Sequence, residues 1–435
     1  MRVAVIGAGA TGLCAARHLK DLKNVTKLVV YEQTSNVSGT WVYTEHTGLD
    51  EHGLPIHSSM YRDMRTNLPK EVMQFPDFPF LTDTPQSFVS HRAVRAYLES
   101  YANHFDLVQF IRFNQHVTRC HKQSDGAWNI TACCVLSGEH SSEQYDSVFV
   151  CNGHYFKPYT LNVAPYECVL MHSHNYRSPE PFEGLSVACI GAGPSGTDIA
   201  IELAAVCPKV YLCHNHPLIK AKLPSNVCQT PGIREFHSSH VTLLDGKDIR
   251  PDAIMLCTGY EYAFPFLDQG VVTVTKGRVT PLYQHLVHIE HPELMFIGLC
   301  SKICPFPNFD VQVRFACALL TNSMPRPISK PEMYEWQEQD FEHRTKELGW
   351  KPRHAHFLGA LQWTYMSNLS KIGGFPNPVP PVAERLYKAV HNQRLTDLTE
   401  YKNAQFQLVD ETNFKQTKGI EMVNTVNMPE VPLPS

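Results

Sequence analysis

Three glycines near the start of the chain have the spacing of a phosphate-binding turn. Gly7, Gly9 and Gly12 lie between the apolar run RVAVI and the helix-like stretch TGLCAARHL. In such a turn the first glycine permits a tight bend, the second lets the backbone approach a pyrophosphate, and the third lets the helix pack against the strand. The start of the helix then offers free N–H groups to the phosphates. This pattern predicts a dinucleotide-binding βαβ unit.

An acidic residue follows the first turn at the expected distance. Glu32 ends the next apolar run, KLVVYE, about 20 residues after Gly12. A carboxylate at this place accepts hydrogen bonds from the ribose hydroxyls and repels a 2′-phosphate. The first turn therefore favours FAD or NAD. The alternative is a glycine-rich packing turn in which Glu32 is a solvated strand end.

A second turn of the same kind lies in the middle of the chain. The apolar run LSVACI leads into Gly191, Gly193, Pro194, Ser195 and Gly196, and another helix-like stretch follows. We assign these five residues to a second dinucleotide on the same physical grounds. Two such units predict an α/β fold with two Rossmann-like dinucleotide-binding domains and mainly parallel sheets.

The strand after the second turn ends without a carboxylate. His214 and His216 stand where Glu32 stands in the first unit, and Lys220 and Lys222 follow. A 2′-phosphate requires that the carboxylate be absent from this place and that hydrogen-bond donors be present. This turn therefore suits NADP, with His214 and His216 as phosphate contacts. Histidine is mostly uncharged at neutral pH, so NADH stays open as the donor. There are two alternatives: the histidines lie on the surface without a role, or the CHNH cluster binds a metal.

Composition and charge exclude several other classes of function. The 435 residues are 43% hydrophobic and 18% charged, which is ordinary for a globular protein of two or three domains. A net charge of −4 gives no electrostatic case for nucleic acid, and no apolar run is long enough to span a membrane.

The fourteen cysteines show no C-x-x-C spacing, so we predict buried free thiols and no metal. Without a recognisable signal peptide we expect a soluble, cytoplasmic protein, secreted only if a leader was removed. Homo-oligomerisation stays open.

At this point the chain resembles the flavin-containing monooxygenases over nearly its whole length. The family pattern F-x-G-x-x-x-H-x-x-x-Y falls on YECVLMHSHNY, where His172 and Tyr176 match and Tyr166 and Cys168 depart. LCTGY is similar to the family's F-A-T-G-Y, and SGTW to its G-G-x-W. The usual arginine after the second unit falls on Asn215. Within the family the chain most resembles the insect pyrrolizidine-alkaloid N-oxygenases.

The resemblance implies that NADPH reduces FAD and that O₂ adds to form a 4a-hydroperoxyflavin. A soft nucleophilic nitrogen or sulfur atom, such as a tertiary amine, an alkaloid or a sulfide, then takes one oxygen atom. The cofactor does this chemistry, so no nucleophile or acid–base pair is needed, and neither G-x-S-x-G nor H-E-x-x-H occurs. The protein must instead exclude water.

The resemblance also assigns roles to single residues. Asn67, in RTNLPKE, is the predicted catalytic residue, with a loop-capping Asx turn as its alternative. Arg314 either approaches the flavin or forms a surface ion pair, and His154 is a candidate for a hinge-side structural histidine where the chain crosses between domains. The residues assigned to FAD are Gly7, Gly9, Thr11, Gly12, Glu32, Gly39, Thr40, Trp41, Asn67, Val117 and Gln312.

Three other interpretations are kept. One is a Baeyer–Villiger monooxygenase acting on ketones, although that family's motif ends in Trp where this chain has Tyr176. The second is a dithiol–disulfide reductase, for which no cysteine pair follows the first unit. The third is a flavin oxidoreductase or flavin-binding protein without oxygenation. We expect an FAD domain of residues 1–162 and 268–435, interrupted by an NADPH domain of residues 163–267, with a cleft at their junction.

Overall fold

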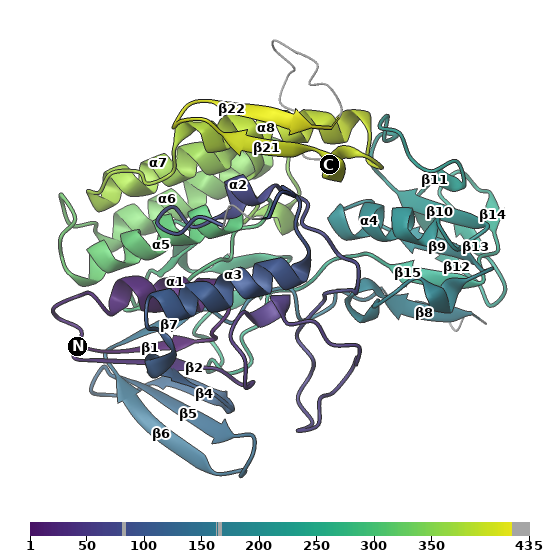
Figure 1. Ribbon diagram of the computed structural model, residues 1–435. Coiled ribbons are helices and arrows are strands. Elements are labelled where there is room, and N and C mark those ends of the chain that lie inside the picture. Colours follow the sequence, from purple (N-terminus) through teal and green to yellow (C-terminus); the bar gives the residue numbers. More distant parts are fainter. Residues whose placement is uncertain (81–83, 162, 164–167, 420–435) are drawn as a thin grey trace.

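The computed structural model describes residues 1–80, 84–161, 163 and 168–419. They form a large unit, built from the first and last parts of the chain, and a small unit built from its middle, drawn in teal in Figure 1. Both units are built on mainly parallel sheets with helices, which confirms the predicted α/β fold class. Tyr166 of the expected family pattern lies outside the described residues.

The large unit is built on a seven-stranded sheet in the order β18-β19-β20-β7-β1-β2-β3. Its middle is parallel, because β1 pairs with β2 and β7 in the same direction, and so does β20 with β7. These strands are short apolar runs, as expected for a parallel sheet covered on both faces. The strands are β1 (Arg2–Ile6), β2 (Lys27–Tyr31), β3 (Ile111–Arg112), β7 (Ser147–Val150), β18 (Leu282–Tyr283), β19 (Val287–His288) and β20 (Leu294–Phe296).

Different layers cover the two faces of this sheet (Figure 1). Val3 and Val5 of β1 pack against helices, whereas Ala4 and Ile6 point the other way and pack against a three-stranded antiparallel sheet. The strands of that sheet are β4 (Gln115–Lys122), β5 (Trp128–Cys134) and β6 (His140–Tyr145). The helices of the large unit are α1 (Ala10–Leu19), α2 (Lys70–Met73), α3 (His91–His104), α5 (Pro305–Leu320), α6 (Lys330–Glu342), α7 (Gln362–Gly373) and α8 (Pro381–Thr396).

The small unit repeats this plan. Its sheet, in the order β11-β10-β9-β15-β8, is parallel throughout. Val187 and Cys189 of β9 pack against α4 (Pro194–Leu203), and Ala188 and Ile190 pack against a second antiparallel sheet. The strands are β8 (Val169–His172), β9 (Ser186–Ile190), β10 (Lys209–His214), β11 (Val227–Pro231), β12 (Ile233–Phe236), β13 (Val241–Leu243), β14 (Asp248–Ile249) and β15 (Ala253–Leu256). Two hairpins complete the fold: β16 (Thr273–Thr275) with β17 (Arg278–Thr280), and β21 (Gln405–Leu408) with β22 (Phe414–Lys418).

Helix α5 begins at Pro305, because proline fits the first helical turn, where its missing N–H costs nothing. Phe266, near the expected domain boundary, is buried in the core between the large sheet and β4–β6. Polar contacts join the units, among them the backbone hydrogen bond from Lys222 N–H to the Thr396 carbonyl at 2.9 Å.

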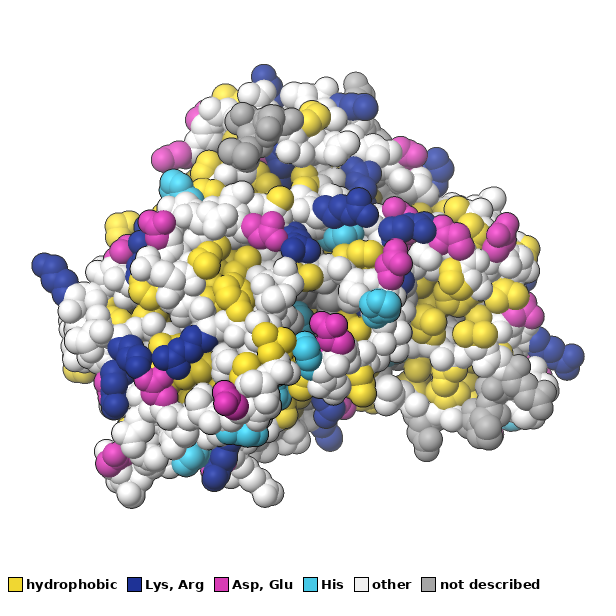
Figure 2. Space-filling model, turned by 60° about the horizontal axis from the view of Figure 1, so that its bottom comes forward, with side chains coloured by type: hydrophobic (Ala, Val, Ile, Leu, Met, Phe, Trp, Pro, Cys, Tyr) yellow, Lys and Arg dark blue, Asp and Glu magenta, His cyan; other side chains and the backbone are white. Residues whose placement is uncertain are grey.

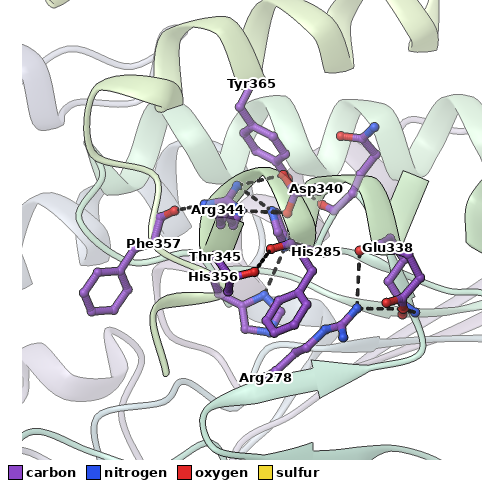
Figure 3. Close-up of polar contacts among 12 residues, drawn as sticks. Arg278, His285, Glu338, Asp340, Arg344, Thr345, His356, Phe357 and Tyr365 are labelled. Atoms are coloured by element: carbon purple, nitrogen blue, oxygen red, sulfur yellow. Dashed lines mark hydrogen bonds and ion pairs between the residues drawn. The ribbon is translucent and has the colours of Figure 1, made fainter. Parts of the chain in front are cut away.

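A polar cluster is buried in the large unit near α6 and α7 (Figure 3). The backbone N–H of Val279 donates to His356 Nε2 at 2.9 Å, so the proton of this neutral ring lies on Nδ1, 3.1 Å from His285 Nδ1. Burial lowers the pKa of both histidines well below the usual range. Arg344, which is 3% exposed, donates to Asp340 at 2.7 Å and also to the carbonyl of Phe357. This network fixes the segment that leads into α7.

All fourteen cysteines are free thiols, as the sequence predicts. Among the helices of the described residues, none has the length and hydropathy that crossing a bilayer requires.

Candidate functional site

The first glycine turn has the close backbone packing that its sequence predicts. Gly7 has φ of +104°, and a Cβ atom there would lie 2.6 Å from the carbonyl oxygen of Cys151. A Cβ atom at Gly12 would lie 1.8 Å from the carbonyl oxygen of Gly7. No side chain fits either position, so the turn brings the start of α1 against the ends of β1 and β7.

The second turn has the same geometry. Gly191 has φ of +108°, a Cβ atom there would lie 2.5 Å from the carbonyl oxygen of Cys257, and one at Gly196 would lie 1.8 Å from that of Gly191. A Cβ atom at Gly193 would meet no described atom within 4 Å. The second glycine therefore borders open space at the start of α4, as close approach of a pyrophosphate requires.

The sequence analysis missed the carbonyl groups against which both turns pack. Cys151 directly follows β7 and Cys257 directly follows β15, and two residues after each cysteine comes a glycine with positive φ, Gly153 at +71° and Gly259 at +86°. These strands pair with β1 and β9, the strands that lead into the two turns, and the repeated Cys-x-Gly after them is the signal that could have identified the carbonyl groups.

Glu32 is buried at the end of β2, with 5% of its surface exposed. One carboxylate oxygen accepts the backbone N–H of Ala8 at 2.9 Å, and the other accepts both the N–H and the hydroxyl of Thr34 at 2.9 Å. A carboxylate has about four acceptor positions, so capacity for a ribose hydroxyl remains. The solvated strand end considered as an alternative does not match this burial.

A short 3₁₀ turn, Gly39–Trp41, lies beside the first glycine turn. A Cβ atom at Gly39 would lie 3.0 Å from the Cα atom of Gly9, so the two glycines are in close contact. The hydroxyl of Thr40 is buried without a hydrogen-bond partner among the described residues. Such an orphaned group fits a bound polar cofactor. Thr11 directs its hydroxyl to the carbonyl of Cys151 at 3.4 Å.

Val117 lies in β4, next to the register shift in its pairing with β5. Its side chain is 6% exposed and packs in the core against the large sheet, so the side chain is not available to a ligand.

Asn67 is exposed on a segment that is fixed on both sides. The N–H of Thr66 donates to the carbonyl of Val89 at 2.8 Å, and the N–H of Lys70 donates to that of Ser87 at 2.7 Å. The amide of Asn67 forms no hydrogen bond with any described residue, so the loop-capping role considered as an alternative is absent. An accessible amide on a rigid segment suits a ligand contact.

Gln312 differs from the other residues assigned to FAD, because its side chain is fully buried. Its oxygen accepts the N–H of Gly298 at 2.9 Å, and its nitrogen donates to the hydroxyl of Tyr365 at 3.0 Å. These partners give Gln312 a positioning role for the loop after β20.

Arg314 donates to Asp310 at 2.6 Å, which is the ion pair considered as its alternative role.

The matched residues of the family pattern have structural partners in the small unit. His172 Nε2 lies 3.1 Å from the carbonyl oxygen of Gly259, its Nδ1 accepts the N–H of His174 at 3.0 Å, and burial lowers its pKa to about 4. The buried Tyr176 donates to Glu202 at 2.8 Å, and burial raises the pKa of that carboxyl group to about 7. His172 therefore ties β8 to the end of β15, which borders the second glycine turn.

The residues after β10 are brought together only in part. His214 Nε2 lies 3.1 Å from the Gln229 oxygen, and the Gln229 nitrogen donates to the carbonyl of Ile219 at 2.9 Å. This orientation makes His214 Nε2 the donor and leaves only an acceptor on Nδ1 in the neutral ring. Lys222 is drawn toward Asp397, with 3.7 Å between the charged atoms.

His154 lies where the chain leaves β7, and its ring is 5.3 Å from that of Tyr262. Burial lowers its pKa to about 4, so it is neutral at physiological pH. A buried, neutral ring of this kind is compatible with the structural role considered for His154.

Comparison with known proteins decides the family. The description "flavin-binding monooxygenase-like" matches residues 1–219 and 212–388. This chain belongs to that family. It is 36% identical to the flavin-containing monooxygenase FMO GS-OX-like 4 of Arabidopsis thaliana, over 85% of this chain and 86% of that protein. It is also 30% identical to the senecionine N-oxygenase of Tyria jacobaeae, over 95% of this chain and 91% of that protein.

Solved structures agree with this assignment. The S-allyl-L-cysteine S-oxygenase of Allium sativum superposes with a TM-score of 0.85 at 33% identity, covering 93% of this chain and 95% of that one. Cyclohexanone monooxygenase, with a TM-score of 0.59 at 14% identity over 86% of this chain and 98% of that one, shares the fold alone. The predicted family, enzyme class and insect N-oxygenase resemblance are therefore confirmed, and the family is one of flavin-binding enzymes. An S-oxygenase and an N-oxygenase both stand among the relatives.

Proposed function

We propose that this chain is an FAD- and NADPH-dependent monooxygenase that transfers one oxygen atom from O₂ to a soft nucleophilic nitrogen or sulfur atom of a small molecule. The observation that carries the proposal is the pair of matching glycine turns, of which only the first is followed by a buried carboxylate, Glu32. The first turn then holds FAD, and the second admits the exchangeable, phosphorylated donor.

When bound, FAD reduced by NADPH activates O₂ and supplies the oxygen atom that is transferred. The protein's part is to bind, orient and exclude water. The N-termini of α1 and α4 would hold the two pyrophosphates, and Glu32 would accept a hydrogen bond from the ribose of FAD. Asn67 would hydrogen-bond the reacting region with its free amide, while Gln312 holds the loop at Gly298.

A substrate panel tests the proposal. The FAD-loaded protein is given NADPH, O₂ and, in turn, a tertiary amine, an alkyl sulfide and a cyclic ketone, and products are quantified against hydrogen peroxide. We expect an N-oxide or S-oxide in near-stoichiometric yield with NADPH consumed, and no lactone. Lactone formation would instead support a Baeyer–Villiger enzyme. NADPH oxidation that yields only hydrogen peroxide with every compound would support an oxidoreductase without oxygenation.

A further inference from the structure

We propose that Asp198, Lys402 and Tyr61 are positioning residues for the reaction, because together they join helix α4 of the small unit to the segment of the large unit that carries Asn67. We call these three residues the Asp198 link. Through this link the unit that binds NADPH sets where Asn67 lies. The inference rests on the proposed function, in which Asn67 contacts the reacting region.

The Asp198 link starts at the second dinucleotide site. Helix α4 begins at Pro194, directly after Gly193 of the glycine turn, and Asp198 lies about one turn further along the helix. Figure 1 shows α4 on the side of the small unit that faces the large unit. A short, regular helix shifts as one rigid element. The position that a bound pyrophosphate gives to the start of α4 is therefore also transmitted to Asp198.

The hydrogen bonds that the Asp198 carboxylate accepts from described side chains all come from the large unit. Lys402 Nζ donates to its two oxygens, at 2.6 and 2.8 Å. The hydroxyl of Tyr61 donates to Oδ2 as well. Burial raises the pKa of Tyr61 well above the usual range, so this hydroxyl keeps its proton. Hydrogen bonds to an ionised partner are stronger than neutral ones, so these contacts hold α4 firmly.

Lys402 extends the Asp198 link toward Asn67. It lies in the 3₁₀ turn Tyr401–Asn403, and its Nζ also donates to the carbonyl of Arg65 at 3.3 Å. In return, the guanidinium group of Arg65 donates to the carbonyl of Lys402 and, at 3.2 Å, to the side-chain oxygen of Asn403. The two segments thus hold each other, and Arg65 stands two residues before Asn67.

Tyr61 anchors the start of the same segment in the small unit. Its side chain is buried in the core of that unit, with its ring 5.4 Å from the ring of Tyr176. The backbone N–H of Arg62 next to it donates to the carbonyl of Arg177 at 2.8 Å. These contacts place the beginning of the segment with the small unit, although the segment belongs to the first part of the chain.

The large unit holds the other side of the segment. The N–H of His91 donates to the carbonyl of Met64 at 3.2 Å, and Thr66 is bonded to Val89 as described above. Asn67 therefore lies within a few residues of contacts with both units. A displacement of about 1 Å is enough to weaken a catalytic contact severely, so losing the hold of the small unit should be measurable.

Polar contacts are frequent at the boundary between the units. Figure 2 shows Asp and Glu (magenta), Lys and Arg (dark blue) and His side chains (cyan) beside one another where the units meet. A second ion pair across the boundary, between Lys222 and Asp397, has 3.7 Å between its charged atoms, and 67% of the Lys222 side chain is exposed. Only 14% of the Lys402 side chain is exposed. Exposed pairs contribute little and breaking a buried pair is costly, so the pair at Asp198 is the stronger of the two.

Hydrogen exchange tests the Asp198 link without reference to turnover. Amide exchange in a peptide covering residues 60–70 of the FAD-loaded protein is measured without NADP⁺ and at NADP⁺ concentrations that titration shows to be saturating. The variants are Asp198→Ala and Tyr61→Phe, of which the second removes one hydroxyl and keeps the packing of the ring. Asp397→Asn is the matched control, because it removes the charge from the other boundary pair while its amide oxygen still accepts the bonds of its own turn.

We expect NADP⁺ to slow exchange in this peptide about threefold or more in the wild type and in Asp397→Asn. In Asp198→Ala the protection should be lost, and in Tyr61→Phe it should fall about twofold, although NADP⁺ still binds to both variants. Such a result separates the position of the segment from the binding of the cofactor.

Product coupling shows whether the Asp198 link acts through Asn67. Consumed NADPH, oxygenated product and hydrogen peroxide are measured for Asp198→Ala, Asn67→Ala and the double variant. Asp198→Ala should divert about threefold more NADPH to hydrogen peroxide than the wild type does. The double variant should be no worse than Asn67→Ala, because a positioning residue has no effect once the residue that it positions is gone. A merely structural role would instead give additive losses.

Three results would overturn the inference. Wild-type protection in both Asp198→Ala and Tyr61→Phe would show that α4 does not hold the segment. Additive losses in the double variant would show that Asp198 does not act through Asn67. Unchanged coupling in Asn67→Ala would refute the role of Asn67 in the proposed function, and the inference would fail with it; the failures are distinguished by which of the two single variants stays coupled.

Discussion

The two dinucleotide turns can be tested separately with one added methyl group in each. Gly193→Ala places a Cβ atom where no described atom lies within 4 Å, and Gly193 has φ of −71° and ψ of −175°, a backbone that alanine adopts freely. We expect its stability to stay within about 1 kcal/mol of the wild type. The methyl group lies where a pyrophosphate must approach, so NADP⁺ affinity should fall about 10- to 100-fold, the equivalent of about 1–3 kcal/mol of overpacking.

Gly196→Ala is the contrasting variant in the same turn. Its Cβ atom would lie 1.8 Å from the carbonyl oxygen of Gly191, so the helix and the turn must separate by about 1 Å. This change should lower both stability and NADP⁺ affinity.

Gly9→Ala is the matched variant in the first turn, where the added atom meets only Gly39 at 3.6 Å. This variant should retain less FAD, and its small unit should fold as in the wild type.

The assay combines thermal unfolding, the FAD content from absorbance and NADP⁺ titration. The reasoning predicts that Gly193→Ala keeps FAD and melts like the wild type but binds NADP⁺ poorly, while Gly9→Ala loses FAD. If Gly193→Ala binds NADP⁺ with wild-type affinity, no pyrophosphate approaches that turn. If both variants lose the same cofactor, the division between the turns is wrong.

Two further outcomes follow from the contacts. Asn67→Ala should fold normally, because the side chain has no described partner, but should divert about tenfold more NADPH to hydrogen peroxide; unchanged coupling between NADPH and product would contradict its role. Arg344→Met should destabilise the fold by about 3–5 kcal/mol in denaturant unfolding, because Asp340 is left without its buried partner; a loss below 1 kcal/mol would show that the network is dispensable.

Local sequence patterns were sufficient for the elements whose structure is determined locally. Apolar runs followed by glycines at fixed spacing predicted both parallel units, because each glycine is required by contacts within its own turn. Helix α3 is also determined locally, because Ser90 caps its start. In α5, by contrast, the buried Asp310 pairs with His18 of a distant helix as well as with Arg314.

The parts that could not be predicted depend on contacts between distant segments. Gln312 was assigned to the flavin, but its amide is occupied by Gly298 and Tyr365, and the second of these comes from another helix. The burial of Phe266 depends on packing with residues of β4 and β5, which no local pattern records. The sequence pattern alone does not distinguish such positions, whereas side-chain hydrogen bonds and core packing do.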